Sequence, residues 1–353
     1  MNKERLEYLM KHPLRKMNKA ELGIIKELLC ALSPSYYLQS IGYKLFDWQK
    51  AVLEDPAKRI CINGARQSGK STIMSGVCCH YAKFHPKSLS VIIAPTKQQS
   101  QEDIFKIRDF MQHDRDYPEL TKTGGDGEII IENGSRILVL TASDKAARGF
   151  SAPGIVLFDE ASRIDDSVLK AVIPMLTGCK DSKLYEISTP FGKKGFFFNH
   201  FMGPSTKWSR YLVRGGFDAT VGADGLPCVV PTQFKPDTGR YKYYISPRHL
   251  DQQEQTGVLE TIHYDTRNYN QEYGCEFVSA DDQAFSQDLI DSLFGTSIPD
   301  EELSAHPGIR DIFGEGEPDP MFMEDCKKEF IKELNYEAKG DKMIRLDKEA
   351  MSW

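Results

Sequence analysis

The sequence lacks the features that would place the chain in a membrane or in an oxidising compartment. No apolar run approaches the length needed to span a bilayer. The amino terminus has basic residues but neither an uninterrupted apolar stretch nor a small-residue cleavage site. The eight cysteines are scattered and form no CxxC pair of the kind that zinc sites and redox motifs use. We therefore expect no membrane contact, reduced and mostly buried thiols, and residence in the cytosol.

The chain also has no excess of positive charge. Its formal net charge is -6 over 353 residues, which argues against a wholly basic surface for nucleic acid and leaves only local patches. The candidate patches are Lys193 and Lys194 with Arg210 and Arg214, and residues 240–248. Short basic clusters are more often solvated surface. With 40% hydrophobic and 27% charged residues, the composition is that of a globular protein with a sizeable core.

Short apolar runs rich in β-branched residues alternate with polar helical stretches in the first two thirds of the chain. Such alternation is typical of a parallel sheet that helices cover on both faces, and it predicts an α/β nucleotide-binding fold. An Asn-Gly pair at 133–134 is a hairpin signal that adds a β-ribbon to this sheet. The apolar runs lie at 59–63, 89–95, 136–142, 154–160 and 183–189.

The chain is expected to contain four segments. Leucines at helical spacing predict helices near the amino terminus. After the alternating region, residues 215–247 are rich in Gly, Pro and Asp and predict a long loop, and residues 247–273 predict helix. Mixed charge around sparse apolar residues predicts a partly helical or mobile tail. The segments are a helical lid (1–40), an α/β core (41–200), a small subdomain that closes the core (201–285) and the tail (286–353).

One segment carries a complete phosphate-binding motif. It reads GARQSGKS and matches G-x-x-x-x-G-K-[ST] between a predicted strand and a predicted helix. The glycines let successive backbone N–H groups face the phosphates, and the helix N-terminus adds its partial positive charge. Lys70 is expected to reach the β- and γ-phosphates of ATP, and Ser71 to ligate Mg²⁺. The predicted nucleotide contacts here are Gly64, Ala65, Arg66, Gln67, Ser68, Gly69, Lys70, Ser71 and Thr72.

Two further strand ends carry polar residues that ATP hydrolysis needs. The apolar run IVLF ends in Asp159 and Glu160; we expect Asp159 to hold Mg²⁺ through water and Glu160 to orient or deprotonate the attacking water. Ser188, Thr189 and Pro190 follow the run KLYEI, and their hydroxyls are expected to sense the γ-phosphate and couple its loss to the rest of the protein. Ser-Thr-Pro alone is a weak signal because it also ends strands. Its position after the carboxylate pair gives it weight.

Together these motifs resemble the large terminase subunit of tailed bacteriophages, the motor that drives DNA into a preformed capsid, over roughly residues 40–285. The segment FDWQ at 46–49 resembles the family's adenine-binding motif and suggests Trp48 and Gln49 as nucleotide contacts. The segments RQSGKST, IVLFDEAS and ISTPFGKKGFFF resemble its Walker A, Walker B and coupling motifs, and EYGCEFVSADDQAFS resembles the segment that closes its ATPase domain. The implied fold is a RecA/ASCE-like P-loop NTPase with a mainly parallel central sheet flanked by helices.

The resemblance also implies roles for two arginines and a set of partners. Arg66 stands where the family carries an arginine inside the phosphate loop. Arg148, eleven residues before Asp159, stands where an arginine can donate to the ATP of a neighbouring subunit; a surface salt bridge is the alternative. The implied partners are double-stranded DNA, further copies in a homo-oligomeric ring, the portal protein and the small terminase subunit, in the cytoplasm of an infected bacterium.

The sequence departs from the family in one respect. Members usually continue into an RNase H-like nuclease, whereas residues 286–353 show no strand with a metal-binding aspartate and are too few for such a domain. The acidic pairs at 281–282 and 301–302 follow no apolar strand and are interpreted as solvated surface. DNA cleavage is then absent, supplied by another chain, or encoded in sequence beyond residue 353.

Two other functions stay open on the sequence alone. A helicase-like DNA-dependent ATPase would share Ala94, Pro95 and Thr96, the following Gln98, and the segment DEAS, but it needs a second RecA-like domain, and no second β-α series is apparent after residue 200. A nucleotide-dependent scaffold with negligible turnover fits the missing nuclease, although every residue that hydrolysis needs is present. The leading prediction is an ATP-hydrolysing motor that translocates double-stranded DNA with ATP and Mg²⁺ as cofactors.

Overall fold

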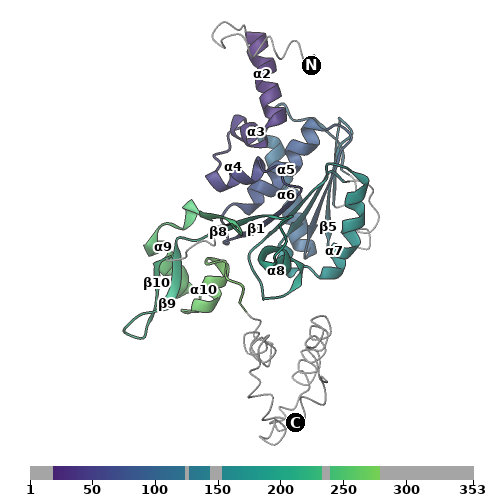
Figure 1. The fold of residues 1–353 in the computed structure, drawn as a ribbon. Helices are drawn as coiled ribbons and strands as arrows, with labels where there is room; N and C mark the ends of the chain where they lie inside the picture. The colour runs from purple at the N-terminus through teal and green to yellow at the C-terminus, as the bar shows by residue number, and fades with distance from the viewer. Residues whose placement is uncertain (1–18, 124–126, 144–152, 233–238, 279–353) are drawn as a thin grey trace, which may run out of the picture. The chain divides into compact units, whose positions relative to one another are not determined.

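The main element of the fold is a nine-stranded sheet in the order β11-β8-β1-β7-β6-β2-β5-β4-β3 (Figure 1). The chain divides into two units, Met1–Val278 and Ser279–Trp353, and every described residue belongs to the first. None of the described helices is both long and apolar enough to cross a membrane. The computed structural model describes residues 19–123, 127–143, 153–232 and 239–278.

The five predicted core strands are confirmed, and they run parallel. The strand β7 lies between β1, which precedes the phosphate loop, and β6, which ends in Asp159. The mainly parallel central sheet that the resemblance implied is thus confirmed. The Asn133–Gly134 turn joins β4 to β5 antiparallel, which confirms the predicted hairpin. The strands of this region are β1 (Arg59–Gly64), β2 (Leu89–Ala94), β3 (Leu120–Thr123), β4 (Glu128–Ile131), β5 (Arg136–Thr141), β6 (Ile155–Asp159) and β7 (Lys183–Ser188).

Helices cover both faces of the parallel strands (Figure 1). Successive side chains of a strand point to opposite faces, so Ile60 and Ile62 of β1 belong to the core that contains residues of α5 and α6, whereas Cys61 belongs to the core that contains residues of α7 and α8. This arrangement buries the strands on both sides and explains their almost continuous apolar sequence. The core helices are α4 (Asp47–Leu53), α5 (Lys70–Phe84), α6 (Lys97–His113), α7 (Asp166–Val172) and α8 (Gly195–Met202). Two 3₁₀ segments, η3 (Ala161–Arg163) and η4 (Ile173–Gly178), flank α7.

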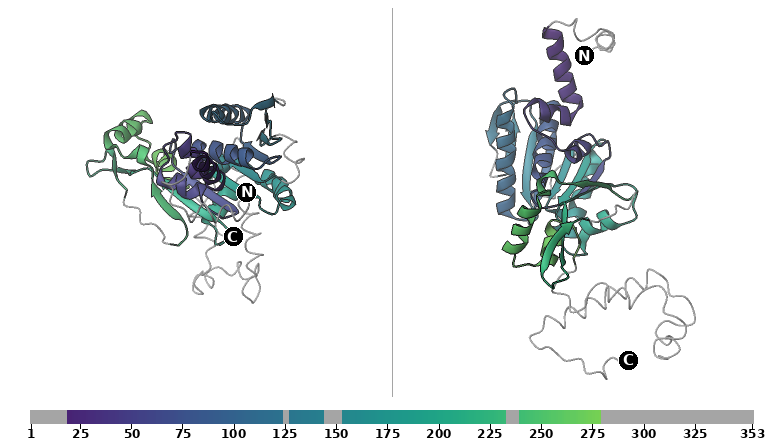
Figure 2. Two further views of the ribbon diagram at one scale, coloured as in Figure 1. Left: turned by 90° about the horizontal axis from the view of Figure 1, so that it is seen from above. Right: turned by 90° about the vertical axis from the view of Figure 1, so that its left-hand side faces the viewer.

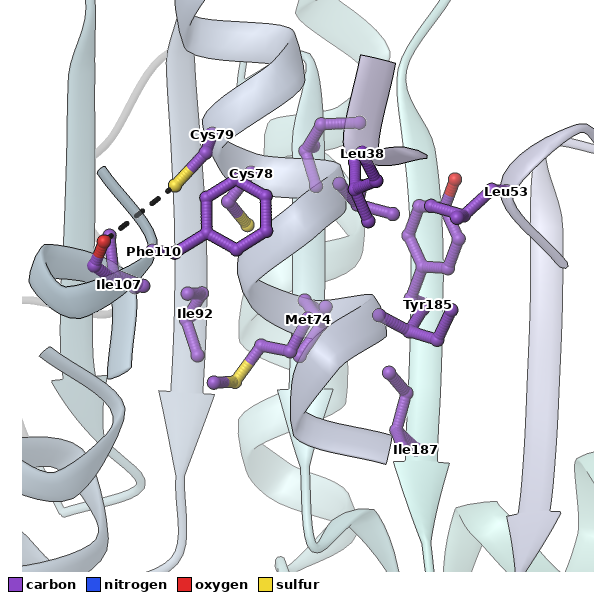
Figure 3. Packing of buried hydrophobic residues seen from close by; sticks show 14 of the residues in the cluster. Leu38, Leu53, Met74, Cys78, Cys79, Ile92, Ile107, Phe110, Tyr185 and Ile187 are labelled. Atoms are coloured by element: carbon purple, nitrogen blue, oxygen red, sulfur yellow. Dashed lines mark hydrogen bonds between the residues drawn. The ribbon is translucent and has the colours of Figure 1, made fainter. Parts of the chain in front are cut away.

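The helix α5, which follows the phosphate loop, is the centre of one of these cores (Figure 3). Its Met74 and Cys78 are buried and belong to the same core cluster as Tyr185 of β7. At Gly76 the helix that contains Leu38 comes very close, because a Cβ atom there would lie only 2.6 Å from Leu38 Cδ2. Any larger residue at this position would force the buried Leu38 side chain to shift. The amino-terminal helices are therefore anchored directly on the helix that begins at the phosphate loop.

The helical character predicted for the amino-terminal segment is confirmed for residues 19–40. The helix α3 (Pro34–Ser40) is capped by Ser33, whose hydroxyl accepts from a backbone N–H of its first turn. The helix α2 (Lys19–Leu32) packs on α3, and its Cys30 carbonyl oxygen lies 2.8 Å from His80 Nε2 of α5, whereas its amino-terminal end projects from the body of the described chain (Figure 2). The predicted helix before residue 19 lies outside the described residues.

The predicted long loop at 215–247 is wrong, because the region contains strands. The strand β8 pairs parallel with β1, and β11 pairs parallel with β8, so the main sheet extends beyond residue 200. The strands β9 and β10 form a separate antiparallel pair. The predicted helical stretch at 247–273 is confirmed. The elements here are β8 (Ser209–Arg214), β9 (Phe217–Val221), β10 (Pro227–Pro231), β11 (Lys242–Ile245), η5 (Pro247–His249), α9 (Gln252–Thr261) and α10 (Thr266–Glu272).

Two arginines of the predicted basic patch are buried rather than exposed. Arg210 donates from Nε to the carbonyl oxygen of His200 at 2.7 Å. Arg214 pairs with the carboxylates of Asp218 and Glu276. The suggestion that these two arginines form a nucleic-acid patch is therefore wrong, because both guanidinium groups serve contacts inside the fold.

A buried carboxyl group lies two residues before the Ser188 end of β7. Glu186 is 0% exposed, and His200 Nδ1 lies 2.8 Å from its Oε1 and 3.1 Å from its Oε2. The ring of Trp208 stacks on His200 with the centroids 4.4 Å apart. Burial raises the pKa of Glu186 from 4.5 to about 7, against the opposing effects of His200, Cys61 and Arg59. The folded protein therefore holds a proton on this group at a higher pH than the unfolded chain does.

We expect Glu186→Gln to remove part of the pH dependence of folding. Because the pKa of the group is raised in the folded state, its favourable contribution is complete below pH 4.5 and is lost as the pH rises through about 7. The wild-type free energy of unfolding should fall by up to about 3 kcal/mol more than that of the variant between pH 4.5 and 8. Urea unfolding at several pH values measures this, with the exposed Glu132→Gln as control. Parallel profiles for all three proteins would contradict it.

Candidate nucleotide-binding site

The predicted phosphate loop forms the turn between β1 and α5. Lys70 is the first residue of α5, and its Nζ donates to the carbonyl oxygens of Gly64 and Ala65, each at 2.9 Å. Gln67 and Gly69 have positive φ angles of 58° and 102°, which turn the backbone around the lysine. Burial lowers the pKa of Lys70. The loop thus holds a partly desolvated ammonium group at the N-terminus of a helix, where anions bind.

A cavity of ≈ 650 Å³ opens at this loop. Its volume is in the range of small-molecule sites. It brings the phosphate loop together with the end of β6, which is about 90 residues further along the chain. The predicted site residues that line it are Arg66, Gln67, Gly69, Lys70, Ser71, Thr72, Asp159 and Glu160.

The two predicted carboxylates, Asp159 and Glu160, lie at the end of β6 and both line the cavity. Asp159 is the last residue of β6 and is buried, and Glu160 follows with a φ of 48°. A positive φ is uncommon for a residue other than glycine, and it is maintained where the surrounding contacts require it. Burial and the charge of Glu160 raise the pKa of Asp159. A cation bound between these groups and phosphate oxygens would remove this repulsion.

The predicted coupling residues contact Glu160 directly. The hydroxyls of Ser188 and Thr189 both donate to Glu160 Oε2, each at 3.3 Å. Ser162 Oγ lies 2.8 Å from Ser188 Oγ and donates to the Thr189 carbonyl oxygen at 2.8 Å. Pro190 is buried after the strand. The sequence predicted that these hydroxyls sense the γ-phosphate; in the structure they hold the carboxylate that faces the cavity.

Ser71 and Asp159 fit the requirements of Mg²⁺. Both carry oxygen donors and both line the same cavity. Mg²⁺ is usually held by one or two carboxylates together with substrate phosphates and water, rather than by a cage of protein ligands. The described residues contain no group of three or more His, Cys, Asp or Glu side chains that could hold a metal ion. Their assignment as metal ligands stays a prediction.

The predicted adenine motif joins α4 to the phosphate loop. Gln49 accepts from the Phe46 backbone N–H at 2.9 Å and donates from Nε2 to the Gly69 carbonyl oxygen at 3.0 Å, so both ends of its amide are engaged. Trp48 is 1% exposed, packs in the core and does not belong to the cavity lining. The predicted contacts of Trp48 and Gln49 with adenine stay predictions. Phe46 is half-buried, with the Arg248 guanidinium 5.7 Å from its ring centre.

Of the two predicted arginines, Arg66 and Arg148, the described residues include Arg66. Its side chain is 65% exposed, and its Nη1 lies 3.5 Å from Glu272 Oε2. Its backbone N–H donates to the Glu272 carbonyl oxygen at 2.8 Å, which ties the phosphate loop to the end of α10. Arg148 lies outside the described residues, as does the tail at 286–353 with its predicted lack of a nuclease. Both stay predictions.

The cavity also contains residues that the sequence analysis did not assign to it. Arg248 Nη1 donates to the Gln67 carbonyl oxygen at 3.2 Å. Burial lowers the pKa of His249 to about 4, with Lys70 and Arg248 adding to the effect. Two sequence signals lay near these residues: the candidate basic patch at 240–248, which contains Arg248, and the helicase-like segment around residues 94–98. The other residues reach the site only through the fold. The additional lining residues are Gln99, Lys106, Arg248, His249, Glu254, Gln255, Val258 and Tyr273.

The site lies within a segment of the chain that matches a known protein family. Residues 61–292 match the family described as terminase large subunit, T4-like virus type, N-terminal. The chain belongs to this terminase family. The match includes the phosphate loop, the Asp159–Glu160 pair and the coupling residues, and it confirms the resemblance that the motifs suggested.

Individual relatives agree with the terminase assignment. The large terminase subunits of Thermus virus P23-45 and Thermus phage G20c are each 26% identical to this chain, over 268 and 269 residues. Each alignment covers 71% of this chain and 52% of the relative, so the chain spans about half the length of the curated relatives it matches. The large terminase ATPase domain of Thermus phage P74-26 has a similar fold, with a TM-score of 0.51 at 23% identity over 70% of this chain and 99% of that one.

Proposed function

We propose that this chain is the ATPase of a viral DNA-packaging motor, which hydrolyses ATP with Mg²⁺ and uses the energy to translocate double-stranded DNA into a capsid. The observation that carries the proposal is the convergence of Lys70, Asp159 and Glu160 on one cavity of a terminase-family fold. The contacts of Ser188 and Thr189 with Glu160 add a direct connection between that cavity and the next strand end. The relatives named above are terminase large subunits.

The proposed chemistry assigns one task to each residue. Lys70 binds the β- and γ-phosphates, and Ser71 and Asp159 hold Mg²⁺, which neutralises charge on the phosphates. Glu160 orients the attacking water and accepts its proton. The two hydroxyls on Glu160 Oε2 fix the carboxylate, so that the other oxygen is presented to the water. Such a site works mainly by positioning and electrostatic stabilisation.

The proposed coupling starts at Glu160 and passes to α8. Release of phosphate changes the environment of Glu160, and the hydroxyls of Ser188 and Thr189 follow its carboxylate. The next residues lead to α8, and the Arg163 guanidinium lies 4.2 Å from the ring centre of Phe191, which joins the turn after Glu160 to this segment. A shift of the Glu160 carboxylate therefore reaches the segment before α8 by two routes. One is the hydrogen bonds from Ser188 and Thr189, and the other is the contact of Arg163 with Phe191.

The remaining elements of the proposal are the roles of two arginines, the oligomeric state and the partners. Arg66 is proposed to donate to the γ-phosphate in its own subunit, and Arg148 to that of a neighbouring copy. Assembly into a homo-oligomeric ring is then part of the catalytic site. The portal protein and the small terminase subunit are the proposed partners besides DNA, and the cytoplasm of the infected bacterium is the proposed place of action.

The proposal predicts ATP hydrolysis that depends on DNA and produces packaging. Phosphate release by the purified chain should rise when linear double-stranded DNA is added. With empty capsids that carry a portal, and with the small subunit, linear DNA should become protected from added nuclease only when ATP is present. A non-hydrolysable ATP analogue in place of ATP is the control.

The same measurements separate the other two functions. Displacement of a strand from a tailed duplex, without nuclease protection, would identify a helicase-like ATPase. Negligible phosphate release with DNA and all partners present would identify a nucleotide-dependent scaffold. Either result would refute the packaging motor.

A further inference from the structure

The first turn of α6 lies beside the end of β6. The strands β2 and β6 pair in parallel, with Ile93 opposite Phe158, so the residues that follow both strands emerge at the same sheet edge. Thr96 caps α6, and its hydroxyl accepts from the backbone N–H of Gln99 at 3.2 Å. This cap fixes the direction of the helix. It places Gln99 in the lining of the nucleotide cavity, next to Asp159.

The amide of Gln99 contacts two carboxylates at once. Its Nε2 donates to Asp159 Oδ2 at 3.1 Å and to Asp103 Oδ1 at 3.2 Å. An amide NH₂ group has two hydrogen atoms and accepts nothing, so both of its hydrogens are used. Asp103 is four residues further along α6 and thus on the same helix face. The side chain of Gln99 is held in one orientation by these two bonds.

Asp103 has no other evident reason to be buried. It is 0% exposed, and its Oδ2 has no hydrogen-bond partner among the described residues. Burying a carboxyl group without full hydrogen bonding costs free energy. Lys106, which lines the cavity, lies 3.8 Å from Asp103 Oδ1 and compensates in part. A costly buried acid that fixes an amide against Asp159 indicates a role at the nucleotide site.

The amide of Gln99 is a direct partner of the Asp159 carboxylate. In the described part of the chain, Gln99 is the one residue whose side chain donates to the Asp159 carboxylate. The bond engages Oδ2 and leaves Oδ1 for a ligand in the cavity. Residues that orient a metal ligand from behind often change metal affinity by about 10–100-fold when they are replaced.

We infer that Gln99, fixed by Asp103, is a positioning residue that orients the Asp159 carboxylate for the divalent cation of the bound nucleotide. The inference rests on the proposed function, since it takes Asp159 as the residue that holds Mg²⁺. It assigns a role to the start of α6, which no motif of the sequence supplied. Neither Gln99 nor Asp103 is expected to touch the reacting atoms.

The test measures cation affinity separately from turnover, with Mn²⁺ as a paramagnetic substitute for Mg²⁺. Electron paramagnetic resonance gives the dissociation constant of Mn²⁺ from the complex of the protein with ADP. Gln99→Ala should raise this constant about tenfold, and Asp103→Ala should raise it about threefold because the amide is then less fixed. Asp103→Asn keeps an acceptor for the amide and should stay within twofold of wild type. Gln98→Ala, which removes the exposed neighbouring amide, is the matched control.

Two further measurements make the result specific. ADP affinity in EDTA should be the same for wild type and all variants, and melting temperatures should agree within a few degrees. A Mn²⁺ constant for Gln99→Ala within twofold of wild type would overturn the inference, and so would an unchanged constant for Asp103→Ala. A wild-type chain that binds neither ADP nor ATP would instead refute the proposed function, so the two failures are distinguishable.

Discussion

Replacing Glu160 with Gln is expected to lower the rate of ATP hydrolysis by at least about 100-fold and to leave ATP bound with near wild-type affinity. A positioned general base contributes about 10²–10⁴-fold to a rate, and the amide of glutamine cannot accept a proton from water. Phosphate release with saturating DNA measures turnover. Calorimetric titration with ATP measures binding in the same preparations.

The structure explains why binding should survive in this variant. Glutamine has the same size as glutamate, and its amide oxygen can accept from the hydroxyls of Ser188 and Thr189 in the place of Glu160 Oε2. The positive φ at this position is unaffected because the backbone does not change. Lys70, which binds the phosphates in our proposal, is also unaltered.

The control for this variant is Glu132→Gln, which removes an exposed carboxylate from the β4–β5 turn. It should hydrolyse ATP at the wild-type rate. If Glu160→Gln retained more than about a tenth of the wild-type rate, another group would have to be the base. If it lost ATP binding as well, Glu160 would be needed for the site itself rather than for the chemical step.

The parts of the fold that could be predicted are those whose sequence pattern is local. Strands buried on both faces are nearly continuous apolar runs, and β6 and β7 were found for that reason. The phosphate loop is contiguous, so its spacing alone identified Lys70 and Ser71. The turn at Asn133–Gly134 requires a positive φ, which is 81° at Gly134, and this requirement is visible in the sequence.

The parts that could not be predicted depend on contacts between distant segments. The strand β8 follows an aromatic helix and precedes a Gly- and Pro-rich stretch, and only its pairing with β1 makes it part of the main sheet. The contact of Gln99 with Asp159 spans 60 positions in the sequence. Trp48 lies in a motif that suggests a nucleotide contact, yet the packing of α4 places its ring in the core. In each case tertiary packing decides what the local pattern leaves open.

Replacing Lys70 with Ala is expected to have the opposite consequence to Glu160→Gln, because nucleotide binding itself should be lost. Hydrogen bonds to charged groups contribute about 1.5–3 kcal/mol each, and the ammonium group is the partner proposed for two phosphates. The dissociation constant of ATP should therefore rise at least about 100-fold, which corresponds to about 2.7 kcal/mol. Calorimetric titration in EDTA measures this without the contribution of the cation, and hydrolysis should disappear in parallel.

The fold should tolerate this change. Burial lowers the pKa of Lys70, because it disfavours the charged form of the side chain in this position. Its removal takes one hydrogen bond from each of the carbonyl oxygens of Gly64 and Ala65, although the Ser68 backbone N–H still donates to Ala65 at 3.2 Å, and it relieves that desolvation. The two effects oppose each other, so the melting temperature should change by only a few degrees. Such a result would separate loss of binding from loss of structure.

Lys97→Ala is the matched control for Lys70→Ala. Lys97 is exposed at the first position of α6, beyond the same sheet edge, and it does not line the cavity. The variant removes the same charge without changing the phosphate loop, and its ATP affinity should stay within about twofold of wild type because exposed charges are screened by solvent and salt. If Lys70→Ala bound ATP as tightly as Lys97→Ala, the ≈ 650 Å³ cavity would not be the ATP site. The proposed function would then lose the observation that carries it, the convergence of Lys70, Asp159 and Glu160 on one ATP site.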